Sequence, residues 1–286
     1  MTHRQSGLEM PNDLIFIRHG ESEANVIQDL ERKGEIHDLH REISSRADWE
    51  QRLTKLGTIQ AESVGAWLDD VMGGIRSFDG CFVSPFMRAR ETASHIGGDD
   101  WIIDDRITER FRGVYGVESF SRAINEDALA ELKTSPWYAR VDGSESMQDV
   151  FHRYRTFQDS LRRNHAGQRV IAVAHGDFIK AARYAIEWLL PETWMSEEKI
   201  AELRLPNGGI VHYTRVNPFN PMEVSHSIKW RRVIFPLDIA NSPFKGSWQE
   251  LDIKRRYTSK ELKKTVDKVK PLLSDIDIET PSKVKK

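Results

Sequence analysis

One pattern occurs twice in this sequence and strongly limits how the chain can fold. Residues 14–17 form an apolar run that ends at Arg18 and His19. A second predicted strand over residues 169–174 is apolar from residue 170 onward and ends at His175, with a glycine after each histidine. Short apolar runs of this kind are typical of strands that are covered on both faces of a sheet. The carboxyl ends of parallel strands meet at one edge, where α/β proteins bind their ligands. We therefore expect His19 and His175 to converge although they are far apart in the chain.

Strands and helices alternate along the rest of the chain. Further strands are predicted over residues 78–84, 101–103 and 209–215, and helices over residues 54–71, 86–96, 118–133, 146–163 and a segment that begins at Gly176. This alternation predicts an α/β fold, a three-layer sandwich whose mainly parallel sheet is flanked by helices. In the helix over 54–71 the expected N-cap is Thr54, and the predicted apolar face consists of Ile59, Val64, Trp67, Leu68 and Val71.

The alternation fades toward the C-terminus, and we divide the chain at residue 240. Residues 1–240 are predicted to form one catalytic domain, with an insert at 26–52 and a cap segment at 111–146. The insert shows little periodicity, and a loop of this length beside a site is often a lid or a specificity element. Residues 241–286 are predicted to be a partly irregular extension with a basic helix near 258–270 and a disordered end.

Composition excludes several classes of protein. The chain has 286 residues, a formal net charge of −2, and no apolar run near the roughly 18 residues that a membrane span needs. Its N-terminal segment lacks the apolar core of a signal peptide, and its single cysteine, Cys81, rules out an intrachain disulfide. We therefore expect a cytoplasmic location, and neither a membrane nor a nucleic acid as partner.

Basic and amide side chains accompany the two histidines. Arg18 directly precedes the first histidine, and Arg88 lies near the start of the helix over 86–96, where the helix dipole favours an anion. Two guanidinium groups can hold a tetrahedral oxyanion with forked hydrogen bonds. Asn25 and the backbone of Gly176 can add neutral donors. Such a pocket suits a phosphoryl group, whose developing charge must be held in a fixed geometry.

Several longer motifs point to one family. They are FIRHGESEAN, LTKLGTIQA, VSPFMRARETA, ITERFRG, the segment from GSES into the following helix, and VIAVAHGD, and they span residues 14–214 in this order. With these motifs the sequence resembles the histidine phosphatase superfamily, in its phosphoglycerate-mutase-like branch. Three of these motifs, FIRHGESEAN, VSPFMRARETA and VIAVAHGD, each supply residues to the expected pocket. Because the three agree independently, the resemblance is specific.

The resemblance implies a role for each matching residue. His19 matches the nucleophile, which forms a phosphohistidine intermediate, and Glu109 matches the proton donor to the leaving oxygen. The groups implied to bind the phosphoryl oxygens are Arg18, Asn25, Arg88 and His175. The resemblance also implies a small phosphorylated substrate and no metal or other cofactor.

The resemblance leaves more than one activity open. Mutases of this branch have a short segment with a TGW-like element after RHGE, whereas residues 26–52 are longer and lack it. This departure favours a metal-independent phosphomonoesterase. The alternatives are a phosphomutase, a phospho-ligand binding or scaffold protein that kept the pocket, and a metallohydrolase built on His19, Glu109 and His175. We expect substrate selectivity to lie in residues 26–52 and 111–146.

The resemblance also leads to a prediction about pH. Glu109 must be protonated to act as an acid, and a phosphate dianion nearby favours this form because like charges disfavour ionisation. His19 must instead be neutral, which two neighbouring arginines promote. We therefore expect the activity optimum on the acidic side of neutral.

Overall fold

The computed structural model describes residues 9–35, 38–113, 130–131, 133–140, 143–253 and 256–271. The chain divides into two compact units, Met1–Asp252 and Ile253–Lys286, and each is described separately. The division at residue 240 remains a prediction about domains. Residues 114–129, 132, 141–142 and 272–286 are outside the described part, and with them most of the predicted helix over 118–133, much of the cap segment and the predicted disordered end.

A seven-stranded mixed sheet forms the centre of the first unit. Its strands, in spatial order, are β3 (Ile102–Ile103), β2 (Gly80–Val83), β4 (Arg169–Ala174), β1 (Asp13–Arg18), β5 (Ile210–Thr214), β8 (Trp230–Ile234) and β9 (Gln249–Glu250). The first four strands run parallel to one another, and β5, β8 and β9 are each antiparallel to the strand before them. A separate hairpin pairs β6 (Val216–Asn217) with β7 (Asn220–Val224).

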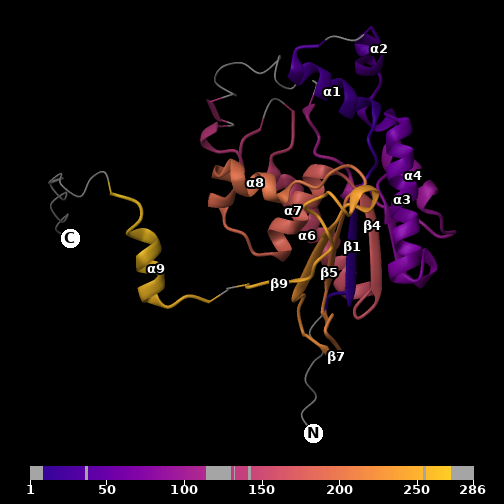
Figure 1. The fold of residues 1–286 in the computed structure, drawn as a ribbon. Helices are drawn as coiled ribbons and strands as arrows, with labels where there is room; N and C mark the ends of the chain where they lie inside the picture. The colour runs from indigo at the N-terminus through magenta and orange to yellow at the C-terminus, as the bar shows by residue number, and fades with distance from the viewer. Residues whose placement is uncertain are drawn as a thin grey trace. The chain divides into compact units, whose positions relative to one another are not determined.

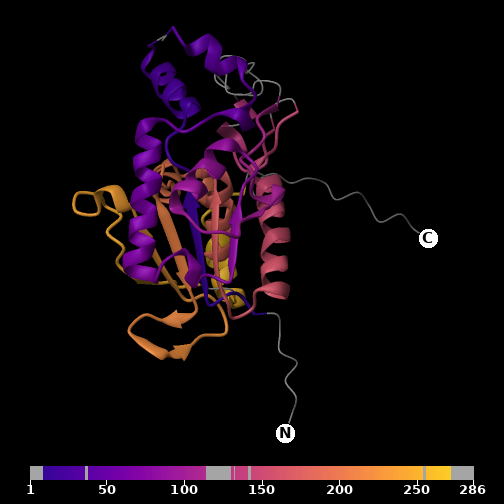
Figure 2. The ribbon, with the colours of Figure 1, turned by 90° about the vertical axis from the view of Figure 1, so that its right-hand side faces the viewer.

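Helices cover both faces of this sheet, as predicted. The helices α3 (Lys55–Met72) and α4 (Met87–Ile96) pack on one face, and α6 (Met147–Asn164) and α7 (Gly176–Ile186) pack on the other (Figures 1 and 2). Further α-helices in the described part of the unit include α1 (Glu23–Lys33), α2 (His40–Ser45) and α8 (Glu197–Leu203). Short 3₁₀ helices among the described residues include η1 (Asp48–Glu50), η2 (Ile75–Ser77), η3 (Asp105–Ile107), η5 (Pro191–Met195) and η6 (Pro236–Asp238).

The uniform apolar run of β1 follows from this layering. Leu14 and Phe16 pack with α6 and α7, whereas Ile15 and Ile17 pack with α3 and α4. All four side chains are fully buried. A strand that is covered on both faces needs apolar residues at every position rather than at alternate ones, so the three-layer prediction is confirmed.

Three expectations from the sequence are wrong. In α3, the predicted apolar-face residues Ile59 and Val71 are 49% and 43% exposed, because the buried face is centred on the smaller Ala61 and Gly65. The insert opens with helix α1 rather than with a loop. The alternation of strands and helices is expected to fade after about Asn217, yet the segment that follows contributes β8 to the main sheet.

The second unit contains one described helix. This is α9 (Ser259–Val266), which lies within the basic helix predicted near 258–270. Its N-cap is Thr258, whose hydroxyl oxygen accepts a hydrogen bond from the backbone N–H of Glu261 while the Glu261 carboxylate accepts one from the N–H of Thr258. This reciprocal pair satisfies two donors at the start of the helix.

Candidate active site

His19 lies directly after β1, and its ring has a defined tautomer. Its Nδ1 is 2.7 Å from the backbone oxygen of Gly20. A carbonyl oxygen can only accept a hydrogen bond, so Nδ1 carries the proton and Nε2 keeps a lone pair. The side chain is 2% exposed, and the structure therefore provides a buried imidazole with one nitrogen suited to nucleophilic attack.

His175 meets His19 as the sequence predicts. The strands β1 and β4 are parallel neighbours, with Arg18 opposite Ala174, so the residues that follow them lie side by side. The two rings have centroids 5.0 Å apart. His175 is fully buried, its Nε2 lies 2.7 Å from Oγ of Ser84, and its Nδ1 has no hydrogen-bond partner.

Both histidines are held in the neutral form. Burial, followed by the charges of Arg88 and Arg18, lowers the pKa of His19 well below its ordinary value. Burial and the charge of Arg88 are also the two largest causes that lower the pKa of His175. The two imidazoles are therefore uncharged at neutral pH, as a nucleophilic histidine must be.

Arg88 belongs to the first turn of α4 and is 4% exposed. Its Nη1 donates to the backbone oxygen of Asp48 at 2.6 Å and to Oδ1 of the same residue at 3.0 Å, and its Nη2 donates to Oδ2 at 3.4 Å. The guanidinium carbon lies 5.0 Å from the ring centroid of Phe86, whose edge contacts His175. Arg88 thus lies between the histidine pair and the 3₁₀ turn η1.

Arg18 crosses the start of α7 from the end of β1. Its Nη1 donates to the backbone oxygen of Leu205 at 2.7 Å, while its Nε is buried without a partner. A Cβ atom at Gly176 would lie 3.5 Å from this Nε, which is an ordinary van der Waals distance and shows that the guanidinium packs directly against the start of α7. A buried donor without a partner is costly, and an anion bound here would satisfy it.

Glu109 is held at the N-terminus of α7. Its Oε1 accepts hydrogen bonds from the backbone N–H of Arg110 at 2.9 Å and of Asp177 at 3.2 Å. Arg153 fixes this segment from α6, because its guanidinium donates to the backbone oxygens of Thr108 and Glu109. The carboxylate that the sequence predicts as an acid therefore has a defined position beside the glycine that follows His175.

Asp177 ties the same segment to α7. Its carboxylate pairs with Arg110 at 3.2 Å and with Lys180 at 2.8 Å. Burial raises the pKa of Asp177, but the charges of Lys180 and Arg110 outweigh this effect and leave the pKa well below its ordinary value. Asp177 is consequently a permanent anion that balances part of the surrounding positive charge.

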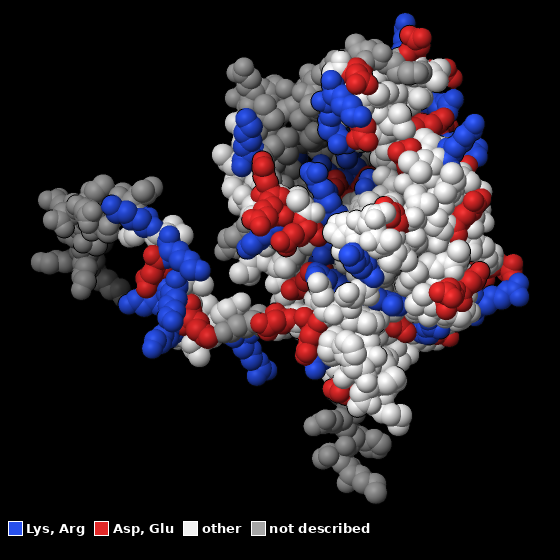
Figure 3. Space-filling model, viewed as in Figure 1, with Lys and Arg blue, Asp and Glu red and all other residues white. Residues whose placement is uncertain are grey.

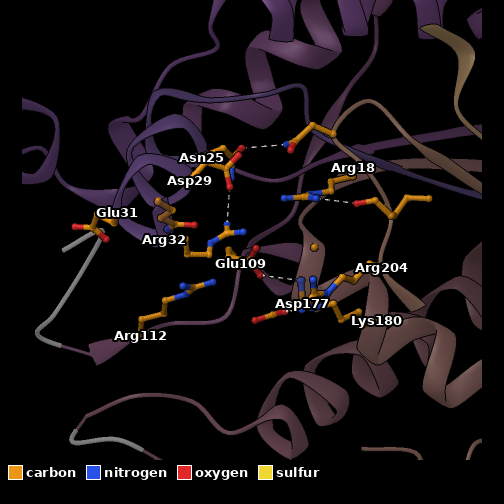
Figure 4. A pocket seen from close by; sticks show the side chains of 14 residues that line it. Arg18, Asn25, Asp29, Glu31, Arg32, Glu109, Arg112, Asp177, Lys180 and Arg204 are labelled. Carbon is orange, nitrogen blue, oxygen red and sulfur yellow. Dashed lines mark hydrogen bonds and ion pairs between the residues drawn. The ribbon is translucent and has the colours of Figure 1, made fainter. Parts of the chain in front are cut away.

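A cavity of about 640 Å³ opens above these elements. Figure 4 shows its lining, and Figure 3 shows Lys, Arg, Asp and Glu side chains gathered around a hollow in the upper part of the molecule. The predicted site residues Arg18, Asn25, Glu109 and Gly176 line it. The remaining predicted residues, His19, Arg88 and His175, are buried and do not belong to the lining.

We use two names for the parts of this site. The inner group consists of Arg18, His19, Arg88 and His175. The outer wall consists of further cavity-lining residues from α1, α7 and the segment after α8, namely Gln28, Arg32, Lys180, Arg204 and Asn207.

Asn25 does not stand alone at the cavity. Its Oδ1 accepts hydrogen bonds from the backbone N–H of Ser22 at 3.1 Å and from Nδ2 of Asn207 at 3.0 Å. Asn207 also donates to the backbone oxygen of His19 at 3.0 Å. The oxygen of Asn25 is therefore engaged, which leaves its Nδ2 as the group able to donate to a ligand.

Two glycines bring the turn after His19 against α3. A Cβ atom at Gly20 would lie 2.3 Å from the backbone oxygen of Gly57, and a Cβ at Gly57 would lie 2.1 Å from the backbone oxygen of Glu21. Thr54, the N-cap of α3, adds a hydrogen bond from its backbone N–H to Glu21 at 2.9 Å. The turn that carries His19 is thus fixed by main-chain contacts.

Sequence reasoning missed three contacts of this site. Asp48 and Asn207 lie in segments without a recognisable pattern, and they reach their partners across 40 and 182 residues of chain. Ser84 belongs to the motif VSPFMRARETA, so its position after β2 could have indicated a contact with His175.

Two classes of feature are missing from the part of the chain that the structure describes. No group of three or more His, Cys, Asp and Glu side chains is placed to bind a metal ion. No helix in the same part is long and apolar enough to cross a membrane.

Fold and geometry together define an α/β protein with a cationic site, built around paired histidines, at the carboxyl edge of its parallel strands. The protein-family model described as "Histidine phosphatase superfamily (branch 1)" matches residues 14–198 of the chain. The chain belongs to this superfamily, which confirms the resemblance seen in its motifs.

Curated relatives of the chain are named as mutases. The chain is 30% identical over 196 residues to a 2,3-bisphosphoglycerate-dependent phosphoglycerate mutase from Methylobacterium sp. (strain 4-46), an alignment that covers 63% of this chain and 83% of the relative. Solved structures with the same fold carry the names of phosphatases. They include a phosphoserine phosphatase from Entamoeba histolytica, with 20% identity, 76% and 95% coverage and a TM-score of 0.55. A mycobacterial glucosyl-3-phosphoglycerate phosphatase has 23% identity, 71% and 92% coverage and a TM-score of 0.54.

Membership of the superfamily supports an enzyme of the phosphatase or phosphotransferase type. The structural likeness is below 25% identity and shows the fold alone.

Proposed function

We propose that the protein is a metal-independent phosphatase that hydrolyses small phosphomonoesters through a phosphohistidine intermediate on Nε2 of His19. The observation that carries this proposal is the hydrogen bond from Nδ1 of His19 to Gly20. This hydrogen bond places the lone pair of the buried, neutral imidazole on Nε2, the nitrogen that faces away from the Gly20 carbonyl. It also restricts rotation of the ring.

In the first step, Nε2 of His19 attacks phosphorus and the ester P–O bond breaks. Glu109 donates its proton to the leaving alkoxide, which is otherwise a poor leaving group. In the second step, a water molecule attacks the phosphorus and passes its proton to Glu109. The P–N bond then breaks, and inorganic phosphate and free His19 are released.

The remaining inner group and its neighbours bind the phosphoryl oxygens in this proposal. Nε of Arg18 and Nδ1 of His175 are both buried without a partner, so both are available to donate to an anion. For His175 this requires the proton on Nδ1, and Nε2 then accepts the hydroxyl hydrogen of Ser84. Fixed donors of this kind stabilise the charge that develops during transfer.

The test uses a generic phosphomonoester in the presence of excess chelator. We expect turnover, and we expect an acid-labile phosphate adduct on the protein after rapid quenching. The variant His19→Ala should lose both, with a fall in kcat on the order of 10⁴-fold or more, because removal of a nucleophile removes the whole covalent route. His152→Ala, at an exposed histidine of α6, is the matched control. Full turnover by His19→Ala would contradict the proposal.

A mutase is the second candidate, because sequence relatives of the chain are named as mutases. In a mutase the phosphohistidine returns its phosphoryl group to the substrate instead of to water. Stoichiometric release of free phosphate from phosphoglycerate, with no isomerised product, excludes it. A protein that binds phosphate but turns over no member of a broad phosphoester panel would instead be a binding or scaffold protein.

A further inference from the structure

The predicted phosphoryl-binding residue Arg88 has a partner that belongs to the insert. Asp48 contacts its guanidinium with three oxygen atoms, which are the backbone oxygen and both carboxylate oxygens. Arg88 is almost fully buried, whereas the side chain of Asp48 is 35% exposed. The insert thus supplies the counter-charge for a buried cation beside the histidine pair.

The segment around Asp48 is fixed to the body of the domain on both sides. Before it, Arg46 pairs with Glu23 of α1 at 3.1 Å. After it, Arg52 donates to both carboxylate oxygens of Glu91 at 2.8 and 2.7 Å. Glu91 lies three residues after Arg88 on α4, so this helix is attached to the segment at two successive points.

The hydrogen-bond geometry of Arg88 distinguishes its two edges. A guanidinium group has five N–H donors. The contacts with Asp48 use the Nη1 group twice and one donor of Nη2, which leaves the N–H of Nε and the second donor of Nη2. These two donors form the edge that binds two oxygens of a carboxylate or phosphate. Asp48 therefore leaves a complete anion-binding edge of Arg88 available.

We propose that Asp48 is a positioning residue that orients Arg88 for phosphoryl binding. Asp48 holds the Nη1 end of the guanidinium, and the opposite edge is thereby presented to the anion. This inference rests on the proposed function, since it concerns the same phosphoryl site. It also assigns a role to part of the insert whose other described contribution to the cavity comes from α1.

The test measures the binding of inorganic phosphate to the purified full-length chain by titration calorimetry. Asp48→Ala should weaken binding by about tenfold or more, the size expected when a hydrogen bond to a charged group is lost. Asp48→Asn keeps the backbone contact and one side-chain acceptor, so it should retain part of the affinity. Glu50→Ala, at an exposed carboxylate of the same 3₁₀ turn, is the control and should bind phosphate as the parent protein does.

A double-mutant cycle separates positioning from a general structural effect. In the background of Arg88→Met, which keeps an apolar stem against Phe86, Asp48→Ala should cause little further loss of phosphate affinity. Equal losses in both backgrounds, unchanged binding by Asp48→Ala, or tighter binding would each overturn the inference. A parent protein that does not bind phosphate at all would contradict the proposed function and remove the site on which the inference rests.

Discussion

The inner group lies at the ends of strands and at the start of one helix, whereas the outer wall comes from α1, α7 and the segment after α8. The three inner residues His19, Arg88 and His175 are almost fully buried. The side chains of the outer wall are exposed or half-buried. Groups of the first kind are positioned by the sheet itself. Groups of the second kind can differ without disturbing the core, with the exception of Asn207, which donates a hydrogen bond to the backbone oxygen of His19. We therefore expect the inner group to control chemistry and the outer wall to control affinity for the rest of the substrate.

The largest loss of activity outside the inner group should come from substitution of Glu109. This residue lines the cavity and is nevertheless proposed to act in the chemical step. Glu109→Gln should lower kcat by about 10²–10⁴-fold for an alkyl phosphate, the usual contribution of general acid catalysis. For an aryl phosphate with an acidic leaving group the loss should be much smaller, because the leaving oxygen needs no proton. The measurement is the dependence of kcat/KM on the pKa of the leaving group. Equal losses for both ester types would show that Glu109 is not the acid.

An intermediate effect should come from the charge of Arg88 on His19. That charge lowers the pKa of His19 after the larger effect of burial, and a protonated His19 cannot attack phosphorus. Activity should therefore persist at weakly acidic pH and fall only as the pH approaches the lowered pKa. Arg88→Met should raise the pKa of His19 and move the acidic limb of kcat/KM to higher pH.

The pH profile of kcat/KM is measured for the parent protein, for Arg88→Met and for Arg90→Met, a control at an exposed arginine of the same helix. An acidic limb that stays in place in Arg88→Met, or that moves equally in Arg90→Met, would count against this electrostatic coupling.

The smallest effect should come from the outer wall. Arg204 is exposed, and an exposed charge contributes about 0–1 kcal/mol to an ionic contact. Arg204→Ala should therefore raise KM for the physiological substrate by less than about tenfold and leave kcat unchanged. Steady-state kinetics on the best substrate of a phosphoester panel provide the measurement. A fall in kcat comparable to that of His19→Ala would break the distinction between the two parts of the site.

The positions of the inner-group residues in the fold could be predicted from sequence, because each residue lies next to a short, recognisable sequence pattern. His19 and His175 directly follow apolar runs, and Arg88 follows a strand and a proline. The meeting of these segments then follows from the parallel order of β1, β4 and β2.

The surroundings of the inner group could not be predicted, for physical reasons. Helix α1 buries only Ala24 and Ile27, so its apolar stripe is too short to stand out in the sequence. β8 is half-buried along its middle and contains two arginines, which hides its strand pattern. The contact between Asp48 and Arg88 depends on how the end of the insert packs against α4. No local sequence pattern predicts this packing, because the two residues are 40 positions apart.

The close approach of Gly20 and Gly57 has a consequence for how such an enzyme can change. Because each Cβ atom would collide with main-chain atoms at 2.3 and 2.1 Å, the contact tolerates no side chain at either position. The turn that carries the attacking nitrogen is thus located mainly by backbone contacts, to which the cavity-lining side chain of Asn207 adds a hydrogen bond with the backbone oxygen of His19. A designer could replace residues of the outer wall other than Asn207 to accept a new phosphate ester while the nucleophile keeps its place. One added methyl group at Gly57 would force apart α3 and the turn that follows the nucleophile, even with every residue of the cavity unchanged.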